Sequence, residues 1–202
     1  MNSLVELAVI LLTIGTLTTG ERTALESNVN SMFGSWGDEQ HCPDGSFAIG
    51  FMIKQEGPQG RGDDTATNGV RLLCDDNDHT SVTSKVGDWG NWIAAETCGN
   101  GRRLWGFKLK VEENQVFRDD TAVNGVSFIC GGGEILEYPG NWGHWRDWHY
   151  CPVGHGICGI KTKVEGKKIM IFNTDNVAMS DMTVYCCPMA CLRSDCGNQP
   201  PA

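Results

Sequence analysis

Apolar and polar residues alternate along two stretches of the chain, residues 47–54 and 105–111, where every second side chain is large and apolar. A period of two is typical of β-strands that bury one face, because successive side chains of a strand point to opposite sides. Gly, Asn and Asp interrupt the chain at intervals of roughly ten residues, which limits the strands to short lengths. The pattern predicts an all-β fold.

One sequence pattern occurs three times along the chain, which indicates a repeat architecture. Asp63-Asp64-Thr65-Ala66 returns 56 residues later as Asp119-Asp120-Thr121-Ala122, and the cysteines that close the three copies are also 56 residues apart. We expect each repeat to form one four-stranded sheet with a single apolar face. Since no unit can bury that face alone, the three are expected to pack around a common axis as one domain. The repeats span residues 33–85, 86–137 and 138–187.

A tryptophan followed by glycine opens each repeat, and these tryptophans recur every 53 positions as Trp36, Trp89 and Trp142. Because the repeat carries them, we expect their side chains to fill the core. Trp145 and Trp148 do not follow this spacing. An aromatic side chain combines a large apolar face with a polar edge, which suits stacking on a sugar ring. These two residues are therefore candidates for a glycan-binding surface.

Asn-Gly dipeptides follow the acidic run in the first two repeats, at Asn68-Gly69 and Asn124-Gly125. This dipeptide favours the type I′ turns of tight β-hairpins, because both central residues of such a turn need a positive φ. We therefore predict turns at these positions. The third repeat has Ser180-Asp181 instead, which argues against a ligand site with strict threefold symmetry.

Ten cysteines behind an apolar leader predict a disulfide framework, and their spacing does not match the closely paired ligands of a zinc site. In the first two repeats, equal separations of 32 residues suggest the pairs, and an insertion in the third extends the separation to 35. The remaining pairs follow by elimination. Adjacent cysteines point to opposite faces of a strand, so Cys186 and Cys187 need different partners. The alternative is that these two cysteines exchange their partners, Cys151 and Cys158. The predicted bridges are Cys42–Cys74, Cys98–Cys130, Cys151–Cys186, Cys158–Cys187 and Cys191–Cys196.

The two ends of the chain differ from the repeats. Residues 1–20 contain an apolar run that is too short to cross a bilayer and ends in small residues, so they are predicted to be a secretory signal peptide. Residues 21–32 form a lead-in, and residues 188–202 a tail with a local disulfide. The formal net charge of −9 repels phosphate backbones and anionic lipid, which excludes nucleic acid and an inserted membrane as partners. We expect a secreted, extracellular protein, and no pattern predicts its oligomeric state.

Two long runs, QGRGDDTATNGVRLLC (Gln59–Cys74) and FRDDTAVNGVSFIC (Phe117–Cys130), occur together with the openings GSWG, GDWGNW and GNWGHW. These runs resemble the vitelline membrane outer layer protein family, and the resemblance extends over residues 33–187. It implies a β-prism of the first type, with three four-stranded Greek-key sheets around a pseudo-threefold axis. It also implies an extracellular coat, egg envelope or mucus layer as the setting, with coat proteins or glycans as partners.

The acidic pairs Asp63-Asp64 and Asp119-Asp120 are the candidates for further chemistry. Aspartates in turns bond to their own backbone, and these pairs recur with the repeats, whereas a glycoside hydrolase uses a single pair of carboxylates. We therefore predict a structural or binding protein in which these aspartates hold turns or contact glycans, and we assign no catalytic residue, cofactor or metal. The alternative is a glycan-modifying enzyme, a transferase or hydrolase acting on N-acetylglucosamine oligomers, an activity that the resemblance suggests.

Overall fold

The computed structural model describes residues 21–56, 67–112, 122–166, 168–170, 173–175 and 178–189. These residues form strands and loops, with one short 3-10 helix at Gly99–Gly101. The predicted all-β fold is confirmed.

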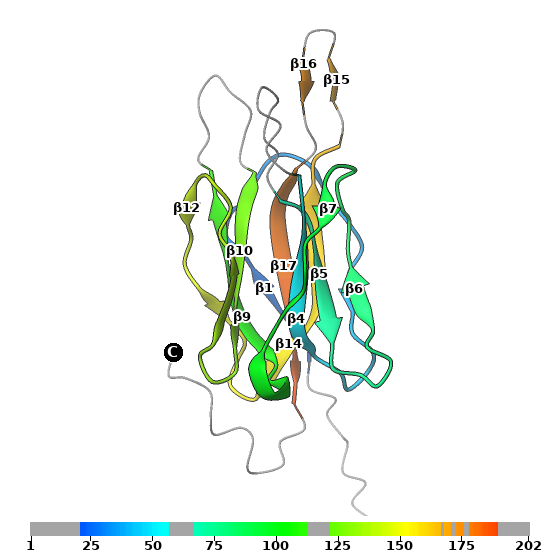
Figure 1. The fold of residues 1–202 in the computed structure, drawn as a ribbon, viewed down its shortest axis with the longest axis vertical. Coiled ribbons are helices and arrows are strands. Elements are labelled where there is room, and N and C mark those ends of the chain that lie inside the picture. Colours follow the sequence, from blue (N-terminus) through cyan, green and yellow to red (C-terminus); the bar gives the residue numbers. More distant parts are fainter. Residues whose placement is uncertain are drawn as a thin grey trace, which may run out of the picture.

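Three long antiparallel strand pairs form the centre of the molecule, one pair in each of three sheets (Figure 1). Alternate side chains of these strands face one shared core, in which the ring centroids of Phe51 and Phe128 lie 4.7 Å apart. Because these two rings come from different sheets, the core belongs to the three sheets together. The pairs are β4 (Ala48–Gln55) with β5 (Thr67–Cys74) in the first sheet, β9 (Leu104–Val111) with β10 (Val123–Cys130) in the second, and β14 (His155–Val164) with β17 (Met179–Pro188) in the third.

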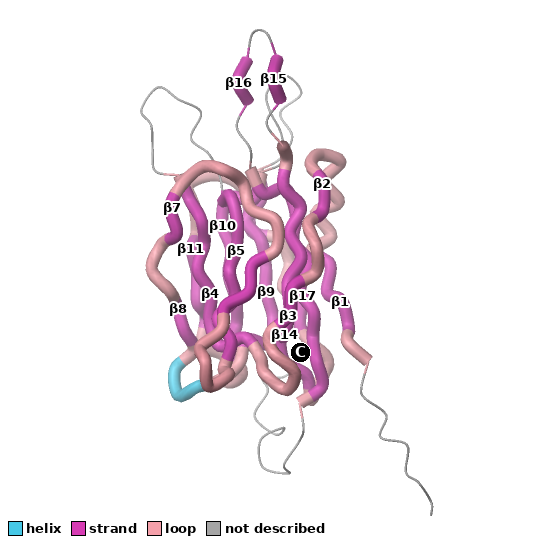
Figure 2. Tube along the Cα trace, turned by 90° about the vertical axis from the view of Figure 1, so that its right-hand side faces the viewer, coloured by secondary structure: helices cyan, strands magenta, loops and turns pink. Residues whose placement is uncertain are grey.

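Short strands complete each sheet to four strand positions. One edge is filled by a single strand, and the other edge by two short strands that follow each other along the same central strand. The order is that of a Greek key, and the strands run along the long axis of the molecule (Figure 2). The protein is therefore a β-prism of the first type, as the resemblance implied. The edge strands are β6 (Ser81–Thr83), β7 (Asn91–Trp92) and β8 (Glu96–Thr97) in the first sheet, β11 (Ile135–Tyr138), β12 (His144–Trp145) and β13 (His149–Tyr150) in the second, and β1 (Thr23–Glu26), β2 (Ser35–Trp36) and β3 (Gln40–His41) in the third; β15 (Lys168–Met170) and β16 (Asn173–Asp175) form a separate pair.

The sheets do not coincide with the sequence repeats, so the expectation of one sheet per repeat is wrong at the boundaries. The opening strands of each repeat complete the sheet of the repeat before it: β7 and β8 lie along β4, and β12 and β13 lie along β9. The physical reason is the Greek key, in which the fourth strand must cross over to the free edge of the first. Each crossover thus carries the chain from one sheet into the next.

The N-terminal segment, residues 23–41, closes the ring by covering both edges of the third sheet. β1 pairs with β17, while β2 and β3 pair with β14. Thr23 is the register partner of Cys186, so the two ends of the described chain lie on adjacent strands. The third Greek key is thus interrupted between β17 and β1, where the other two sheets have a continuous chain.

The Asn-Gly dipeptides lie inside strands, and the prediction of hairpin turns there is wrong. In the second sheet the register shifts between Val123 and Gly125, which makes Asn124 the extra residue of a β-bulge. A Cβ atom at Gly125 would lie 2.7 Å from the carbonyl oxygens of Tyr138 and Pro139. The glycine therefore permits the close approach of the edge strand. Asn68-Gly69 and Ser180-Asp181 occupy the same bulge in the first and third sheets.

Asp181 takes the place of this glycine in the third sheet and fastens the N-terminal segment. The side chain is buried, and its Oδ1 atom accepts hydrogen bonds from the Ser27 hydroxyl and from the Met182 N–H, the latter at 2.7 Å. Burial raises the pKa of the Asp181 carboxyl above the ordinary value of 3.8. An ionised carboxylate at this site therefore opposes folding, although its hydrogen bonds support the contact.

We expect Asp181→Asn to raise the melting temperature at pH 7, because the amide keeps an acceptor oxygen and removes the buried charge. A raised folded-state pKa makes the wild-type protein lose stability as the pH rises above 3.8, the unfolded value. The difference between the two proteins should therefore shrink as the pH is lowered toward about 4, because the folded carboxyl then takes up its proton. Thermal unfolding across this pH range measures it, with the exposed Asp147→Asn as control. A variant that is less stable at every pH would contradict the role of charge burial.

Four disulfides staple the sheets, and the described residues contain no free cysteine. Cys186 faces the core and bonds to Cys151, whereas Cys187 lies on the outer side and bonds to Cys158. The alternative exchange of Cys186 with Cys187 therefore does not occur. The bridges are Cys42–Cys74, Cys98–Cys130, Cys151–Cys186 and Cys158–Cys187. The first three are the pairs that the spacing suggested and the fourth is the pair left by elimination, while Cys191 and Cys196 lie outside the described residues.

Candidate functional site

The predicted ligand-binding residues divide into two groups. Asp63, Asp64, Asp119 and Asp120 lie outside the described residues. Trp145 and Trp148 lie on the outer side of the second sheet, where both rings contact the ammonium group of Lys108. The description of the candidate site therefore rests on the tryptophans.

Trp145 belongs to the threefold repeat, and the prediction that it is extra to the pattern is wrong. Trp145 pairs with Lys110 of β9, Trp92 pairs with Lys54 of β4, and Trp36 pairs with Lys163 of β14. The three lysines occupy one equivalent position of the central strands. Trp36, Trp92 and Trp145 are therefore equivalent. The prediction that Trp36 is equivalent to Trp89 and Trp142 is wrong by three residues.

A signal for the correct register is present in the sequence. Trp36 stands six residues before Cys42, and the corresponding tryptophans stand six residues before Cys98 and Cys151. The Trp-Gly dipeptides conceal this spacing. They recur every 53 residues, but Trp36 does not occupy the position in its repeat that Trp89 and Trp142 occupy in theirs. Aligning the repeats on the first cysteine of each disulfide gives the register that the strands adopt.

The predicted core role of the opening tryptophans is also wrong. Trp36, Trp89 and Trp142 are 40%, 43% and 44% exposed. Lys110 alternates with the buried Leu109 and Val111, so it faces outward, and the side chain paired with it faces outward as well. The core is filled by other apolar residues of the long strands.

Each sheet carries two aromatic residues, three positions apart, at the start of its two-part edge. We call these pairs the aromatic corners: Phe33 with Trp36, Trp89 with Trp92, and Trp142 with Trp145. A glycine with a positive φ separates the two aromatic residues at every corner: Gly34 (81°), Gly90 (83°) and Gly143 (88°). A side chain on any of these glycines would overlap the backbone of the central strand. The corner backbone is therefore the same in the three sheets.

The equivalent lysines hold the corners in place. The Lys54 ammonium donates hydrogen bonds to the carbonyl oxygens of Gly87 and Asp88, at 2.7 and 3.0 Å. Lys110 donates to the Gly140 carbonyl oxygen at 3.4 Å, and Lys163 donates to that of Ser31. Each lysine thus anchors the loop that leads into its corner, because a charged donor strengthens such a bond.

A cation also lies near one tryptophan at every corner. The Arg71 guanidinium lies 4.2 Å from the ring centroid of Trp92, and the Lys108 ammonium lies 4.3 Å from that of Trp145. At the third sheet the ammonium groups of Lys161 and Lys163 are both 5.9 Å from the Trp36 ring. These cation–π contacts orient the tryptophan rings on the outer face.

The second sheet adds Trp148 and Tyr150 to its corner, and we call Trp145, Trp148 and Tyr150 its aromatic surface. The Lys108 ammonium lies 4.9 Å from the Trp148 ring and 3.4 Å from the Glu137 carboxylate. The Trp148 ring stacks with that of Tyr150 at a centroid distance of 6.0 Å. Trp148 has no aromatic counterpart, because Glu39 and Ala95 hold its position in the other sheets. The prediction that Trp148 is extra to the repeat therefore agrees with the strand register.

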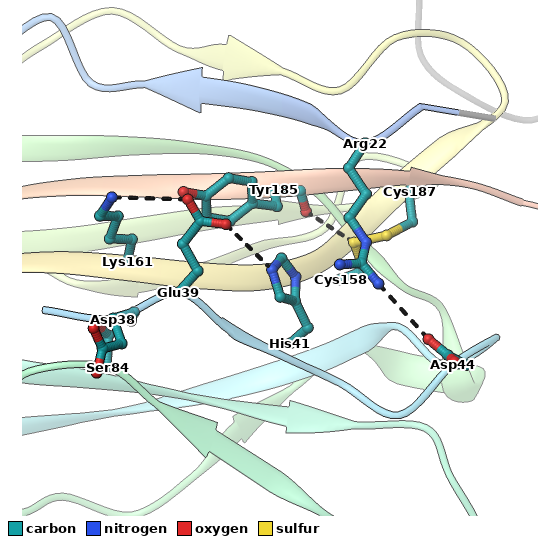
Figure 3. Close-up of polar contacts among 10 residues, drawn as sticks. All are labelled: Arg22, Asp38, Glu39, His41, Asp44, Ser84, Cys158, Lys161, Tyr185 and Cys187. Atoms are coloured by element: carbon teal, nitrogen blue, oxygen red, sulfur yellow. Dashed lines mark hydrogen bonds and ion pairs between the residues drawn. A yellow bond between two sulfur atoms is a disulfide. The ribbon is translucent and has the colours of Figure 1, made fainter. Parts of the chain in front are cut away.

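A polar cluster takes the place of this surface in the third sheet (Figure 3). The Glu39 carboxylate lies 3.7 Å from the Lys161 ammonium and 3.7 Å from the His41 ring nitrogen Nε2. A hydrogen bond from the Tyr185 hydroxyl lowers the pKa of Glu39, and burial lowers the pKa of His41, so the carboxylate is charged and the imidazole neutral at pH 7. Burial raises the pKa of Tyr185. The cluster joins β3 to β14 and β17.

The polar cluster does not provide the arrangement that glycoside hydrolysis needs. Such chemistry uses two carboxylates in environments that separate their pKa values, whereas in this cluster the Glu39 carboxylate is already engaged by Tyr185, Lys161 and His41. Within the described residues, no group of three or more histidine, cysteine or acidic side chains is placed to hold a metal ion. The same part of the chain contains no helix with the length and apolar character of a membrane span.

Comparison with known proteins gives matches in sequence and in fold. The family model "Vitelline membrane outer layer protein I" matches residues 23–189. The human "Vitelline membrane outer layer protein 1 homolog" is 40% identical over 176 residues, which cover 83% of this chain and 84% of the human protein. The mouse homolog is 42% identical over 165 residues and covers 76% of this chain and 79% of its own length.

Two solved structures show a similar fold. Calystegia sepium agglutinin superposes with a TM-score of 0.55 at 15% identity, covering 84% of this chain and 98% of the agglutinin. Artocarpin, solved in complex with methyl α-mannose, superposes with a TM-score of 0.52 at 10% identity, covering 83% of this chain and 99% of artocarpin. At these identities the likeness concerns the fold alone.

Proposed function

Because this chain belongs to the vitelline membrane outer layer protein I family, we propose that it is a secreted, non-enzymatic protein of an extracellular coat that binds glycans on its outer faces. The coat is an egg envelope or a mucus layer, and the partners are glycans and other coat proteins. The four disulfides support an extracellular location, since such bridges persist in oxidising compartments. The predicted signal peptide, residues 1–20, supplies the route of export.

The aromatic surface of the second sheet is the observation that carries the glycan proposal. Trp145 and Trp148 share one cation, and their rings belong to side chains that are only partly covered by the protein. A pyranose ring has an apolar face of C–H groups and a rim of hydroxyls. It can therefore stack on such a ring while the Lys108 ammonium and the Glu137 carboxylate stay within reach of its hydroxyls. The mannoside complex of artocarpin indicates that a prism of this type can host a sugar.

The enzyme alternative has no support among the described residues. In the polar cluster of the third sheet, the Glu39 carboxylate is engaged by the Lys161 ammonium and the His41 ring. The aspartates outside the described residues recur with the repeats, and we propose that they hold turns and contribute at most contacts to a bound glycan. The protein would then act through the rigidity of a prism that has one shared core and four disulfides among its described residues.

A glycan array with the mature protein tests the proposal. We expect binding by the wild-type protein and a loss of about tenfold in affinity for Trp148→Ala, which corresponds to about 1.4 kcal/mol of lost stacking. Ile135→Ala is the matched control, because this residue is also apolar and exposed on the second sheet, 53% of its surface being accessible. Equal binding by wild type and Trp148→Ala would contradict the assignment of this surface. Cleavage or elongation of N-acetylglucosamine oligomers by the purified protein would favour the enzyme alternative.

A further inference from the structure

We propose that the three aromatic corners are three copies of one glycan-binding site, so that a single molecule can hold three glycan chains at once. The inference rests on the proposed function and extends it from one glycan-binding surface to three glycan-binding sites per molecule. It gives the protein the activity of a cross-linker in the coat.

The three corners share their backbone and their supports. Each has a glycine with positive φ, a lysine that anchors the preceding loop, and a tryptophan directly paired with that lysine. Every corner also has one tryptophan that is largely exposed: Trp36, the second aromatic residue of its pair, at 40%, and Trp89 and Trp142, the first of theirs, at 43% and 44%. A ring kept outside the core at the corner of each of three sheets contributes little to folding, and its presence at all three corners calls for another role.

The corners face in three directions. They lie on the outer sides of three sheets that surround one core, and the strands that carry them, β2, β7 and β12, lie toward the same end of the prism (Figures 1 and 2). The outer faces of a closed prism point away from one another. A short oligosaccharide bound at one corner therefore cannot occupy a second corner of the same molecule, and each corner is free to engage a separate chain.

The surroundings of the corners fit a sugar better than a protein partner. Trp89 lies between exposed polar residues, Asp88 and Asn91, and Trp142 lies between exposed Asn141 and His144. A stable protein interface buries roughly 800 Å² on each partner and needs a continuous centre from which water is excluded. A single ring within a polar rim matches a pyranose, which offers one apolar face and several hydroxyls.

The corners are not identical, and their differences predict an order of affinity. The second sheet adds the Trp148 ring beside its corner, and the first sheet has two tryptophans with the Arg71 guanidinium. The third sheet has Phe33 in place of one tryptophan and the charged Glu39 in place of Trp148. We therefore expect the second corner to bind most tightly and the third most weakly.

Three weak glycan-binding sites on one rigid molecule can link glycan chains into a network. A polymer that engages two corners of different molecules gains avidity without new contacts, because the second binding event is local. Four disulfides and one shared core keep the corners at constant separations. A coat protein with this geometry would link glycan chains into a mesh.

The test compares single variants, Trp36→Ala, Trp89→Ala and Trp142→Ala, with the triple variant. The probes are tri-N-acetylchitotriose and mannotriose, each used free and coupled in many copies to polyacrylamide. Calorimetry with the free trisaccharide measures the number of sites, and turbidity with the polymer measures cross-linking. We expect three sites in the wild type, two in each single variant, and neither binding nor cross-linking in the triple variant.

The outcomes separate the inference from the proposed function. One site in the wild type, unchanged by Trp36→Ala and Trp89→Ala, would overturn the threefold valence and leave the glycan-binding proposal intact. Binding of neither trisaccharide by the wild type would overturn both. Thermal melts accompany each variant, and if the triple variant does not fold, the site counts of the three single variants decide the question.

Discussion

A chain that lacks residues 21–41 should not fold to a stable monomer. These residues supply β1 on one edge of the third sheet and β2 and β3 on the other, so their removal leaves both β17 and β14 without a partner on the outside. Unpaired strand edges promote association with other chains. The hydrogen bond between Ser27 and Asp181 is lost as well, which leaves a buried carboxyl without its hydroxyl partner. We expect no cooperative thermal transition and an aggregated profile in size-exclusion chromatography.

A circular permutant provides the matched control. Thr23 and Cys186 are register partners, so a short linker can join residue 189 to residue 21. A new start between Asp44 and Gly45 opens an exposed turn, where cuts are tolerated best. The same strands are then present in a different order, and Cys42 can still reach Cys74. We expect this permutant to melt cooperatively as a monomer, within several degrees of the wild type. A truncated chain that does the same would show that the N-terminal strands are dispensable.

Gly50→Ala should be strongly destabilising although it adds a single methyl group. Gly50 lies in β4 opposite Thr97 of β8, and a Cβ atom there would overlap the Glu96 carbonyl oxygen and lie 2.9 Å from the Cα of Thr97. Because both neighbours are backbone atoms, no change of rotamer can relieve the overlap. Overpacking of this kind costs roughly 1–3 kcal/mol, and more when an edge strand is displaced. Chemical denaturation of the mature protein, with its disulfides intact, measures the change in the free energy of unfolding.

Gly131→Ala is the control for the Gly50 substitution. A Cβ atom at Gly131 would meet its nearest neighbour, the Arg103 carbonyl oxygen, at 3.8 Å, which is an ordinary contact. Its stability should therefore stay within about 0.5 kcal/mol of the wild type, as for most surface substitutions. If Gly50→Ala proved equally mild, β8 would be free to move away from β4. Gly106 and Gly159 occupy the equivalent positions, so Gly106→Ala and Gly159→Ala should repeat the effect.

The linear sequence determined the class of fold, the number of repeats and the disulfide framework. Alternation over residues 47–54 reports a one-sided strand, because the side-chain period of a strand is a local property of the backbone. Equal sequence separations between cysteines indicate the same disulfide in each repeat, because repeated units have the same fold and place their cysteines at equivalent positions. The register of Trp36, Trp92 and Trp145 was also within reach, through their common distance from the next cysteine.

Only the tertiary structure decided which sheet each segment joins and which side chains face outward. The Asn-Gly dipeptides have the chemistry of a turn, yet they lie in bulges, because a neighbouring edge strand passes too close for a side chain. Trp36, Trp92 and Trp145 have the apolar character of core residues, yet their partners in the sheet are outward-facing lysines. The polar cluster of Glu39, His41 and Tyr185 joins residues from both ends of the chain. Each of these features depends on which edge is free when the Greek key closes, and no local stretch of sequence encodes that choice.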